Sequence, residues 1–318
     1  MTDDGVRVEA AYEPYAPGAA AGSPAGSAAS EGRAEGCSEE CPEGRTEARS
    51  QDCRRASAEG PPPATLVPPA IVLAHGFSGA YDRPAVRRAA RVFARHAAVV
   101  TFSFRGHGGS GGRSTVGDRE VLDLAAAVRW ARALGHRRVT TVGFSMGGSV
   151  ALRHAALYAR AYPGPYPAPD GSAATAGRAL REGCAPEGAH ADAVVSVSAP
   201  ARWFYRGTAP MRRLHWAVTR PTGRLVTRYG LRTRIHPHDW DPVPLSPVEA
   251  VPLIAPRPLL IVHGDRDGYF PLDHPHMLAA AGDPTATELW IERGFGHAES
   301  AADERLLTRI AAWAAGRG

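Results

Sequence analysis

The chain has 318 residues, of which 44% are hydrophobic and 22% are charged, as in a globular protein of one or two domains. No apolar run approaches the ~18 residues that a membrane-spanning helix needs. The first five residues, Met1 to Gly5, include two aspartates and no basic residue, whereas a signal peptide begins with basic residues followed by apolar ones. These features exclude an integral membrane protein and predict a cytoplasmic one.

The charge is distributed unevenly along the chain. All 37 basic residues are arginine, and the formal net charge is +5. Nine of the arginines lie between Ala201 and His238, a segment without an acidic residue, so the remainder of the chain has a net charge of −4. Because no nucleic-acid recognition motif accompanies these arginines, we expect no nucleic-acid partner.

The four cysteines do not form the pattern of a disulfide framework or a metal site. Cys37, Cys41 and Cys53 lie in one polar stretch that contains no histidine, and Cys184 lies in another. We therefore expect free thiols and no bound metal.

Two stretches contain too few large apolar residues to form part of a core. Residues 15–64 and 162–190 consist mainly of Ala, Gly, Ser, Pro, Glu and Arg. Such segments cannot bury enough apolar surface to offset the entropy that ordering costs. We predict a disordered, low-complexity insertion at 15–64 and a flexible loop at 162–190.

Elsewhere, strand-like and helix-like segments alternate. The period-two pattern of residues 5–14 predicts an edge strand or hairpin. Short apolar runs predict further strands at residues 70–74, 97–104, 138–144, 192–199, 258–263 and 287–291. Helical spacing predicts helices at residues 83–96, 118–133, 146–161, 271–281 and 301–315. This order predicts an α/β fold with a mostly parallel central sheet, covered by helices on both faces.

The arginine-rich segment interrupts this alternation between two predicted strands. We assign residues 201–255 to a cap or lid inserted over the carboxyl ends of the strands. The core then comprises the N-terminal strand in residues 1–14, residues 65–200 and residues 256–318.

The strongest motif for chemistry is Gly143-Phe144-Ser145-Met146-Gly147. It follows a predicted strand and precedes a predicted helix, which is the context that a G-x-S-x-G nucleophile elbow requires. The flanking glycines allow strand and helix to approach closely, and the helix N-terminus supplies amide donors near the serine. Ser145 is therefore the predicted nucleophile.

A serine needs a general base, and the base needs an acid that orients it. Asp265 and Asp267 follow the strand at residues 258–263, and His297 lies in a glycine-rich loop after the strand at residues 287–291. The order serine, acid, histidine is the one that such sheets use. His297 is the predicted base, and the spacing alone leaves both aspartates open as the acid.

Four motifs together resemble the α/β-hydrolase superfamily, in particular its cap-bearing esterase, lipase and serine-aminopeptidase-like branch. They are His75-Gly76-Phe77, RGHGGS at 105–110, the Ser145 motif, and the pair HGDRD at 263–267 with GFGH at 294–297. The resemblance covers residues 5–13 and 65–318, and the long insertion between these parts departs from the family pattern.

The resemblance implies roles for further residues. The backbone N–H groups of Phe77 and Met146 are expected to form the oxyanion hole. The family spacing G-x-x-D-x-x-x-P fits Gly264, Asp267 and Pro271, which favours Asp267 over Asp265.

The glycine-rich segment 105–112 has a second interpretation, as a phosphate-binding loop. It lacks the Gly-Lys-Ser/Thr ending of a P-loop and the spacing of a dinucleotide-binding motif. We favour a loop at the mouth of the site, with a structural role for His107.

These features predict a serine hydrolase that cleaves a carboxylic ester, thioester or amide of a small molecule through an acyl-enzyme, without a cofactor. An acyltransferase or a serine-aminopeptidase-like peptidase could use the same residues. A non-catalytic binding protein is the alternative of another class, which the complete set of three residues disfavours.

The cap contributes the predicted substrate contacts Trp203, Phe204 and Tyr205. Its arginines would also suit an anionic substrate or an anionic lipid surface, although we do not expect membrane contact. The sequence fixes neither the identity of the substrate nor the oligomeric state.

Overall fold

The computed structural model describes residues 1–18, 67–158 and 188–317. Residues Met1–Gly18 and Pro68–Gly318 belong to one compact unit, to which the following description applies. The predicted insertion at 15–64 and loop at 162–190 lie outside the described residues except at their ends. Within the described part, no helix is long and apolar enough to cross a membrane.

The centre of this unit is a seven-stranded sheet in the order β1-β3-β2-β4-β5-β6-β7. The strands are β1 (Ala10–Glu13), β2 (Ala70–Ala74), β3 (Ala98–Phe102), β4 (Val139–Phe144), β5 (Ala193–Val197), β6 (Leu259–Gly264) and β7 (Thr287–Glu292). Every neighbouring pair is parallel except β1 with β3, which is antiparallel. The predicted mostly parallel sheet is confirmed.

Burial explains why the inner strands read as continuous apolar runs. Every residue of β2, β3, β4, β5 and β6 is buried, because both faces of a parallel sheet are covered. Alternate residues of one strand belong to different cores. Ile71 and Leu73 pack with one set of helices, and Val72 and Ala74 with the other.

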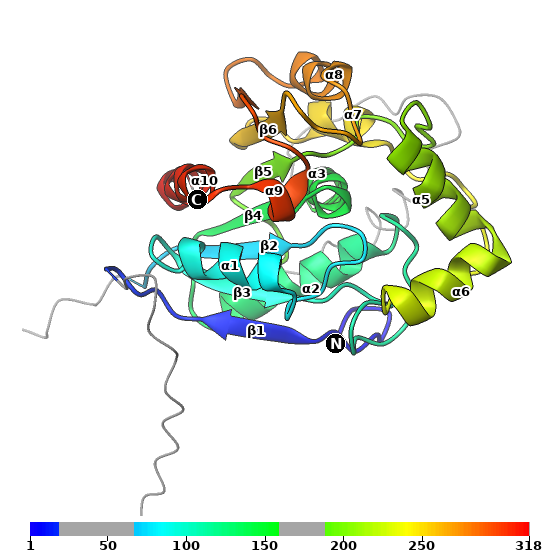
Figure 1. Ribbon diagram of the computed structural model, residues 1–318. Coiled ribbons are helices and arrows are strands. Elements are labelled where there is room, and N and C mark those ends of the chain that lie inside the picture. Colours follow the sequence, from blue (N-terminus) through cyan, green and yellow to red (C-terminus); the bar gives the residue numbers. More distant parts are fainter. Residues whose placement is uncertain (19–66, 159–187, 318) are drawn as a thin grey trace, which may run out of the picture. The chain divides into compact units, whose positions relative to one another are not determined.

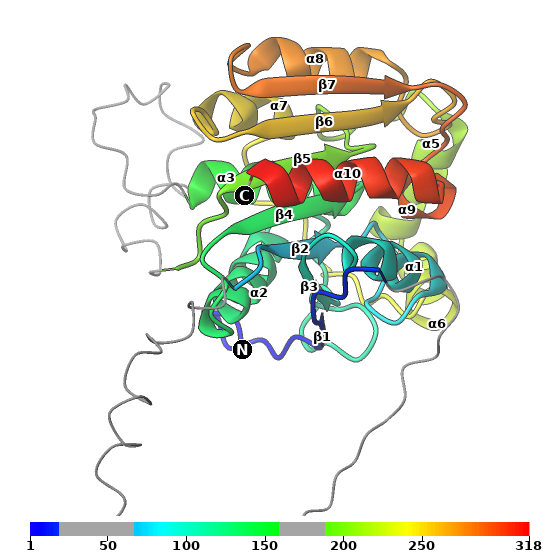
Figure 2. The ribbon, with the colours of Figure 1, turned by 90° about the vertical axis from the view of Figure 1, so that its left-hand side faces the viewer.

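The two sets of helices lie on opposite faces of the sheet (Figure 2). One face is covered by α1 (Pro84–Phe93), α9 (Ala298–Ala301) and α10 (Glu304–Arg317). The other is covered by α2 (Glu120–Ala133), α3 (Met146–Leu157) and α8 (Asp273–Ala281). The predicted helical layers on both faces are therefore present.

Two helices between β5 and β6 lie beyond the carboxyl ends of the strands, α5 (Ala209–Thr219) and α6 (Pro221–Gly230) (Figure 1). They are separate helices because Arg220 is extended, as expected before a proline, and Pro221 suits the first turn of α6. The short helices α7 (Pro247–Ala250) and η2 (Val251–Leu253) follow them. Both pack on α3, so the last residues of the predicted cap range contact the core.

Candidate active site

Ser145 occupies a sharp turn between β4 and α3. Its backbone has φ 52° and ψ −115°, a conformation that an L-residue adopts only under constraint. A Cβ atom on Gly143 would lie 2.1 Å from the carbonyl oxygen of Gly147, and one on Gly147 would lie 2.3 Å from that of Ala74. Only glycine fits at these two positions. The strand and the helix can therefore approach closely, and the turn between them holds the Ser145 side chain above the edge of the sheet.

The structure brings the three predicted side chains together in hydrogen-bonding succession. Ser145 Oγ lies 2.9 Å from His297 Nε2, and His297 Nδ1 lies 2.8 Å from Asp267 Oδ2. With the proton on Nδ1, His297 donates to the carboxylate and accepts from the serine hydroxyl. Asp265 is not part of this series of hydrogen bonds, because its exposed carboxylate accepts the backbone N–H of Gly294 instead.

Asp267 lies in an environment that keeps its carboxyl group ionised. The side chain is fully buried, and burial alone would raise its pKa. The hydrogen bond from His297 and those from the backbone N–H groups of Tyr269 and Phe270 outweigh this effect, so the pKa of Asp267 lies below its ordinary value. A negative charge is thus held next to the ring nitrogen that it orients.

The two predicted oxyanion-hole amides are free to donate. Among the described residues, neither the Phe77 nor the Met146 backbone N–H has a protein acceptor. Met146 is the first residue of α3, where N–H groups have no intrahelical partner and the helix dipole is positive.

His75 holds the loop that presents Phe77. Its Nδ1–H donates to the carbonyl oxygen of Gly76 (2.7 Å), and its Nε2 accepts the backbone N–H of Phe104 (3.0 Å). Burial lowers the pKa of His75 to about 3, so the ring stays neutral and both bonds are compatible with one tautomer. The end of β2 is thereby tied to the end of β3.

Ion pairs of Arg105 hold the glycine-rich loop after β3 in place. Arg105 forms a fork with Asp123 of α2 (2.8 Å) and a second ion pair with Asp4 (2.7 Å). His107 is fully buried, with its ring against those of His75 and Phe77. These contacts are those of a structural histidine.

Two aromatic side chains near His297 were not predicted from the sequence. The Tyr269 ring stacks on the His297 ring, with centroids 4.1 Å apart and an interplanar angle of 23°. His263, at the end of β6, is buried, and its Nε2–H donates to the carbonyl oxygen of Phe270 (2.9 Å). Burial lowers the pKa of His263, so a neutral ring packs behind Asp267. His263 is the first residue of the HGDRD motif, but the sequence gives neither residue a role at the site.

Glu299 is a third residue that the sequence did not reveal. Its carboxyl group is buried, and Oε1 accepts the backbone N–H of Gly76 at 3.3 Å. Among the described residues, its Oε2 has no hydrogen-bond partner. Burial raises the pKa of Glu299, so a second acid lies beside the elbow in an environment that favours its neutral form.

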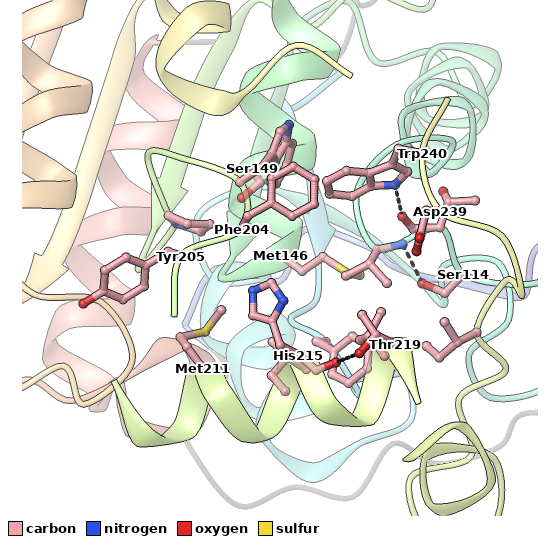
Figure 3. Close-up of a pocket in the computed structure, with 18 of the residues that line it drawn as sticks. Ser114, Met146, Ser149, Phe204, Tyr205, Met211, His215, Thr219, Asp239 and Trp240 are labelled. Atoms are coloured by element: carbon pink, nitrogen blue, oxygen red, sulfur yellow. Dashed lines mark hydrogen bonds between the residues drawn. The ribbon is translucent and has the colours of Figure 1, made fainter. Parts of the chain in front are cut away.

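Ser145 lines a cavity of about 250 Å³. Figure 3 shows this cavity. Phe77 and Met146 lie in its wall, and so do the three predicted contact residues Trp203, Phe204 and Tyr205. Further apolar walls come from α5 and from the segments that follow α6 and β6, namely Met211, Leu214, Val218, Ile235, Trp240 and Phe270. The arrangement suits an apolar group next to a carbonyl carbon at Ser145.

Comparison with known proteins agrees with this geometry. Residues 69–166 match the family model described as the alpha/beta hydrolase fold. An esterase from Pyrococcus furiosus is similar in structure, with a TM-score of 0.52 and 20% identity over 76% of this chain and 81% of that one. The 2,6-dihydroxy-pseudo-oxynicotine hydrolase has a TM-score of 0.53 and 18% identity, over 81% of this chain and 62% of that one.

At these identities the structural likeness concerns the fold, and the comparison with curated proteins gives no match. The family match, the strand order and the turn that holds Ser145 nevertheless agree with one another. The chain has the alpha/beta hydrolase fold.

Proposed function

We propose that the protein is a serine hydrolase that cleaves a carboxylic ester or thioester, with Ser145 as nucleophile, His297 as general base and acid, and Asp267 as the orienting acid. The observation that carries this proposal is the continuous hydrogen-bonded chain from Ser145 Oγ through His297 to Asp267 at the edge of an apolar cavity.

In the first half of the reaction, Ser145 Oγ attacks the carbonyl carbon and its proton passes to His297 Nε2. The carbonyl oxygen becomes an oxyanion, which accepts hydrogen bonds from the N–H groups of Phe77 and Met146. Asp267 remains ionised and stabilises the imidazolium. The tetrahedral intermediate then expels the leaving group, which takes the proton from His297.

In the second half, water attacks the acyl-enzyme. The water gives a proton to His297 Nε2, and the resulting oxyanion lies in the same hole. Collapse of this second intermediate returns the proton to Ser145 Oγ and releases the carboxylic acid. No group beyond these residues and water is required for the proton balance.

The charge of the cavity favours an ester over a peptide with a free amino terminus. Its lining contains the cations Arg202, Arg206 and Arg224, whereas Asp239 is its one carboxylate among the described residues. A protonated amine would meet net repulsion there. This observation ranks an aminopeptidase below an esterase.

Hydrolysis of 4-nitrophenyl butyrate by the full chain and by Ser145→Ala tests the proposal. We expect the variant to lose activity by roughly 10⁴-fold or more, because the nucleophile is absent, while its thermal unfolding stays cooperative. A variant that retained most of the hydrolysis would overturn the assignment.

A further inference from the structure

The segment from Arg206 to Arg234 has a cationic surface and contains no acidic residue. Eight arginines lie between Arg206 and Arg234, and among the described residues none of them forms an ion pair with a carboxylate. Arg202, which precedes them, does pair, with Asp273 at 3.4 Å. Uncompensated guanidinium groups at close spacing raise the local positive potential and attract anions.

Part of this charge lines a second hollow, of about 530 Å³, along α5. Its lining residues are Arg206, Arg212, His215, Trp216, Thr219 and Arg220. We call this hollow the arginine groove. Burial, and then the charge of Arg206, lower the pKa of His215, so the positive charge of the groove comes from its three arginines.

The arginine groove adjoins the cavity beside Ser145. Arg206, His215 and Thr219 line both hollows. Figure 3 shows His215 pointing from α5 into the cavity, with Thr219 one turn further along the same helix. A ligand that extends from Ser145 past His215 would reach the arginines of the groove.

At least one arginine of the groove is held ready for a ligand. Arg212 Nη1 donates to the carbonyl oxygens of Arg206 (3.4 Å) and Gly207 (3.1 Å). Among the described residues, its Nε and Nη2 have no protein acceptor. A guanidinium group fixed on one side and free on the other suits a carboxylate or phosphate oxygen.

We propose that the substrate of this hydrolase has an apolar part next to the scissile carbonyl and, beyond it, an anionic group that lies in the arginine groove against Arg206, Arg212 and Arg220. The inference rests on the proposed hydrolase function and adds the substrate class to it. The shared chemistry of the anion is an oxyanion group, a carboxylate or a phosphate.

Matched ester pairs test the proposal on both sides of the scissile bond. On the acyl side, we compare 4-nitrophenyl esters of adipic acid, of its monomethyl ester and of 6-phosphonooxyhexanoic acid. On the leaving-group side, we compare 4-(2-carboxyethyl)phenyl butyrate with its methyl ester. In at least one of these sets, an anionic ester should have a kcat/KM at least about 10-fold above its neutral partner. The preference should shrink as salt screens the groove. Whether the carboxylate or the phosphate is preferred tells the two anion sources apart.

Variants of the groove arginines test whether the preference for anionic esters arises in the groove. In Arg212→Gln/Arg220→Gln the ratio of anionic to neutral kcat/KM should fall toward 1. Arg228→Gln is the matched control, because Arg228 is also an unpaired cap arginine but lines neither hollow, and it should keep the ratio. Equal turnover of anionic and neutral esters on both sides at low salt would overturn the proposal, as would a preference that survives the double variant.

A binding measurement separates this inference from the proposed function. Isothermal titration calorimetry measures binding of hexyl phosphate and of hexanol to the Ser145→Ala protein. We expect hexyl phosphate to bind at least about 10-fold more tightly, and the double variant to lose that difference. Equal affinities for hexyl phosphate and hexanol would refute anion binding in the groove, even if the enzyme hydrolyses esters. If the protein hydrolysed no ester but still bound hexyl phosphate more tightly, only the hydrolase function would be refuted.

Discussion

Asp265 and Asp267 differ by two positions in sequence, yet their surroundings give them different chemistry. Asp267 is buried between His297 and two backbone N–H groups, whereas Asp265 is exposed and accepts one backbone N–H. The family spacing favoured Asp267, and the side-chain contacts give the physical reason. A carboxylate that receives three hydrogen bonds stays ionised and holds its partner in one orientation.

The two aspartates give a matched test at the residue scale. Asp267→Asn should lower kcat by about 10⁴-fold, because an amide cannot stabilise the imidazolium and favours the wrong tautomer of His297. Asp265→Asn makes the same chemical change outside the hydrogen-bonded chain and should change kcat by less than about 10-fold. Steady-state kinetics on 4-nitrophenyl butyrate measures both, and similar losses in the two variants would contradict the assignment.

Glu299 predicts an effect of pH on stability. Because burial raises its pKa above the ordinary 4.5, the folded protein keeps a proton that the unfolded chain releases as pH rises. The free energy of unfolding therefore falls with increasing pH above about 4.5. Glutamine cannot ionise, so Glu299→Gln should gain stability relative to the wild type between pH 4 and pH 8.

Urea unfolding at pH 4, 6 and 8 measures this difference, with Glu304→Gln as the control because Glu304 is exposed. If the difference between Glu299→Gln and wild type stays constant with pH, then burial does not perturb this carboxyl group. The measurement is independent of catalysis.

At the scale of elements, the turn around Ser145 depends on two glycines that allow β4, α3 and β2 to touch. Gly147→Ala places a methyl group 2.3 Å from a backbone oxygen of β2, which no side-chain rotation relieves. We expect a loss of more than about 2 kcal/mol in the free energy of unfolding. Gly316→Ala, in α10 with open space around it, should be neutral or stabilising by up to about 1 kcal/mol. Equal effects of the two substitutions in urea unfolding would refute this account of the turn.

The hydrophobic pattern predicted the presence of helices and strands more accurately than it predicted their first and last residues. The helix predicted at 301–315 is interrupted, because Asp303 Oδ1 accepts the backbone N–H of Leu306 and so caps a new helix, α10, after the short α9. The strand predicted within 5–14 is confined to Ala10–Glu13, where β3 runs alongside it. The ends of helices and strands depend on helix-capping side chains and on pairing with neighbouring strands, neither of which the periodicity of apolar residues reveals.

At the scale of the whole molecule, the parallel sheet explains why distant residues could be predicted to meet. Ser145, Asp267 and His297 each follow the carboxyl end of a parallel strand, so chain order alone directed them to one edge. Glu299 and His263 escaped prediction because their roles arise from packing. Glu299 contacts Gly76 across 223 residues, and neither residue belongs to a motif that names the other.

The predicted cap range is a second example of contacts that the sequence does not reveal. Composition revealed an excess of arginine between residues 201 and 238, and aromatic residues suited to a pocket wall. It did not reveal that three of the arginines share a hollow that adjoins the cavity at Ser145. That knowledge requires the helix break at Pro221 and the direction in which α5 runs.

Labelling with a fluorophosphonate probe, followed by mass mapping of the modified peptide, tests the central claim most directly, since the probe reacts only with a serine activated by its own base. We expect one adduct per chain, on Ser145, and a far slower reaction in His297→Ala. A chain that does not react at all, or an adduct on another serine that persists in Ser145→Ala, would contradict it.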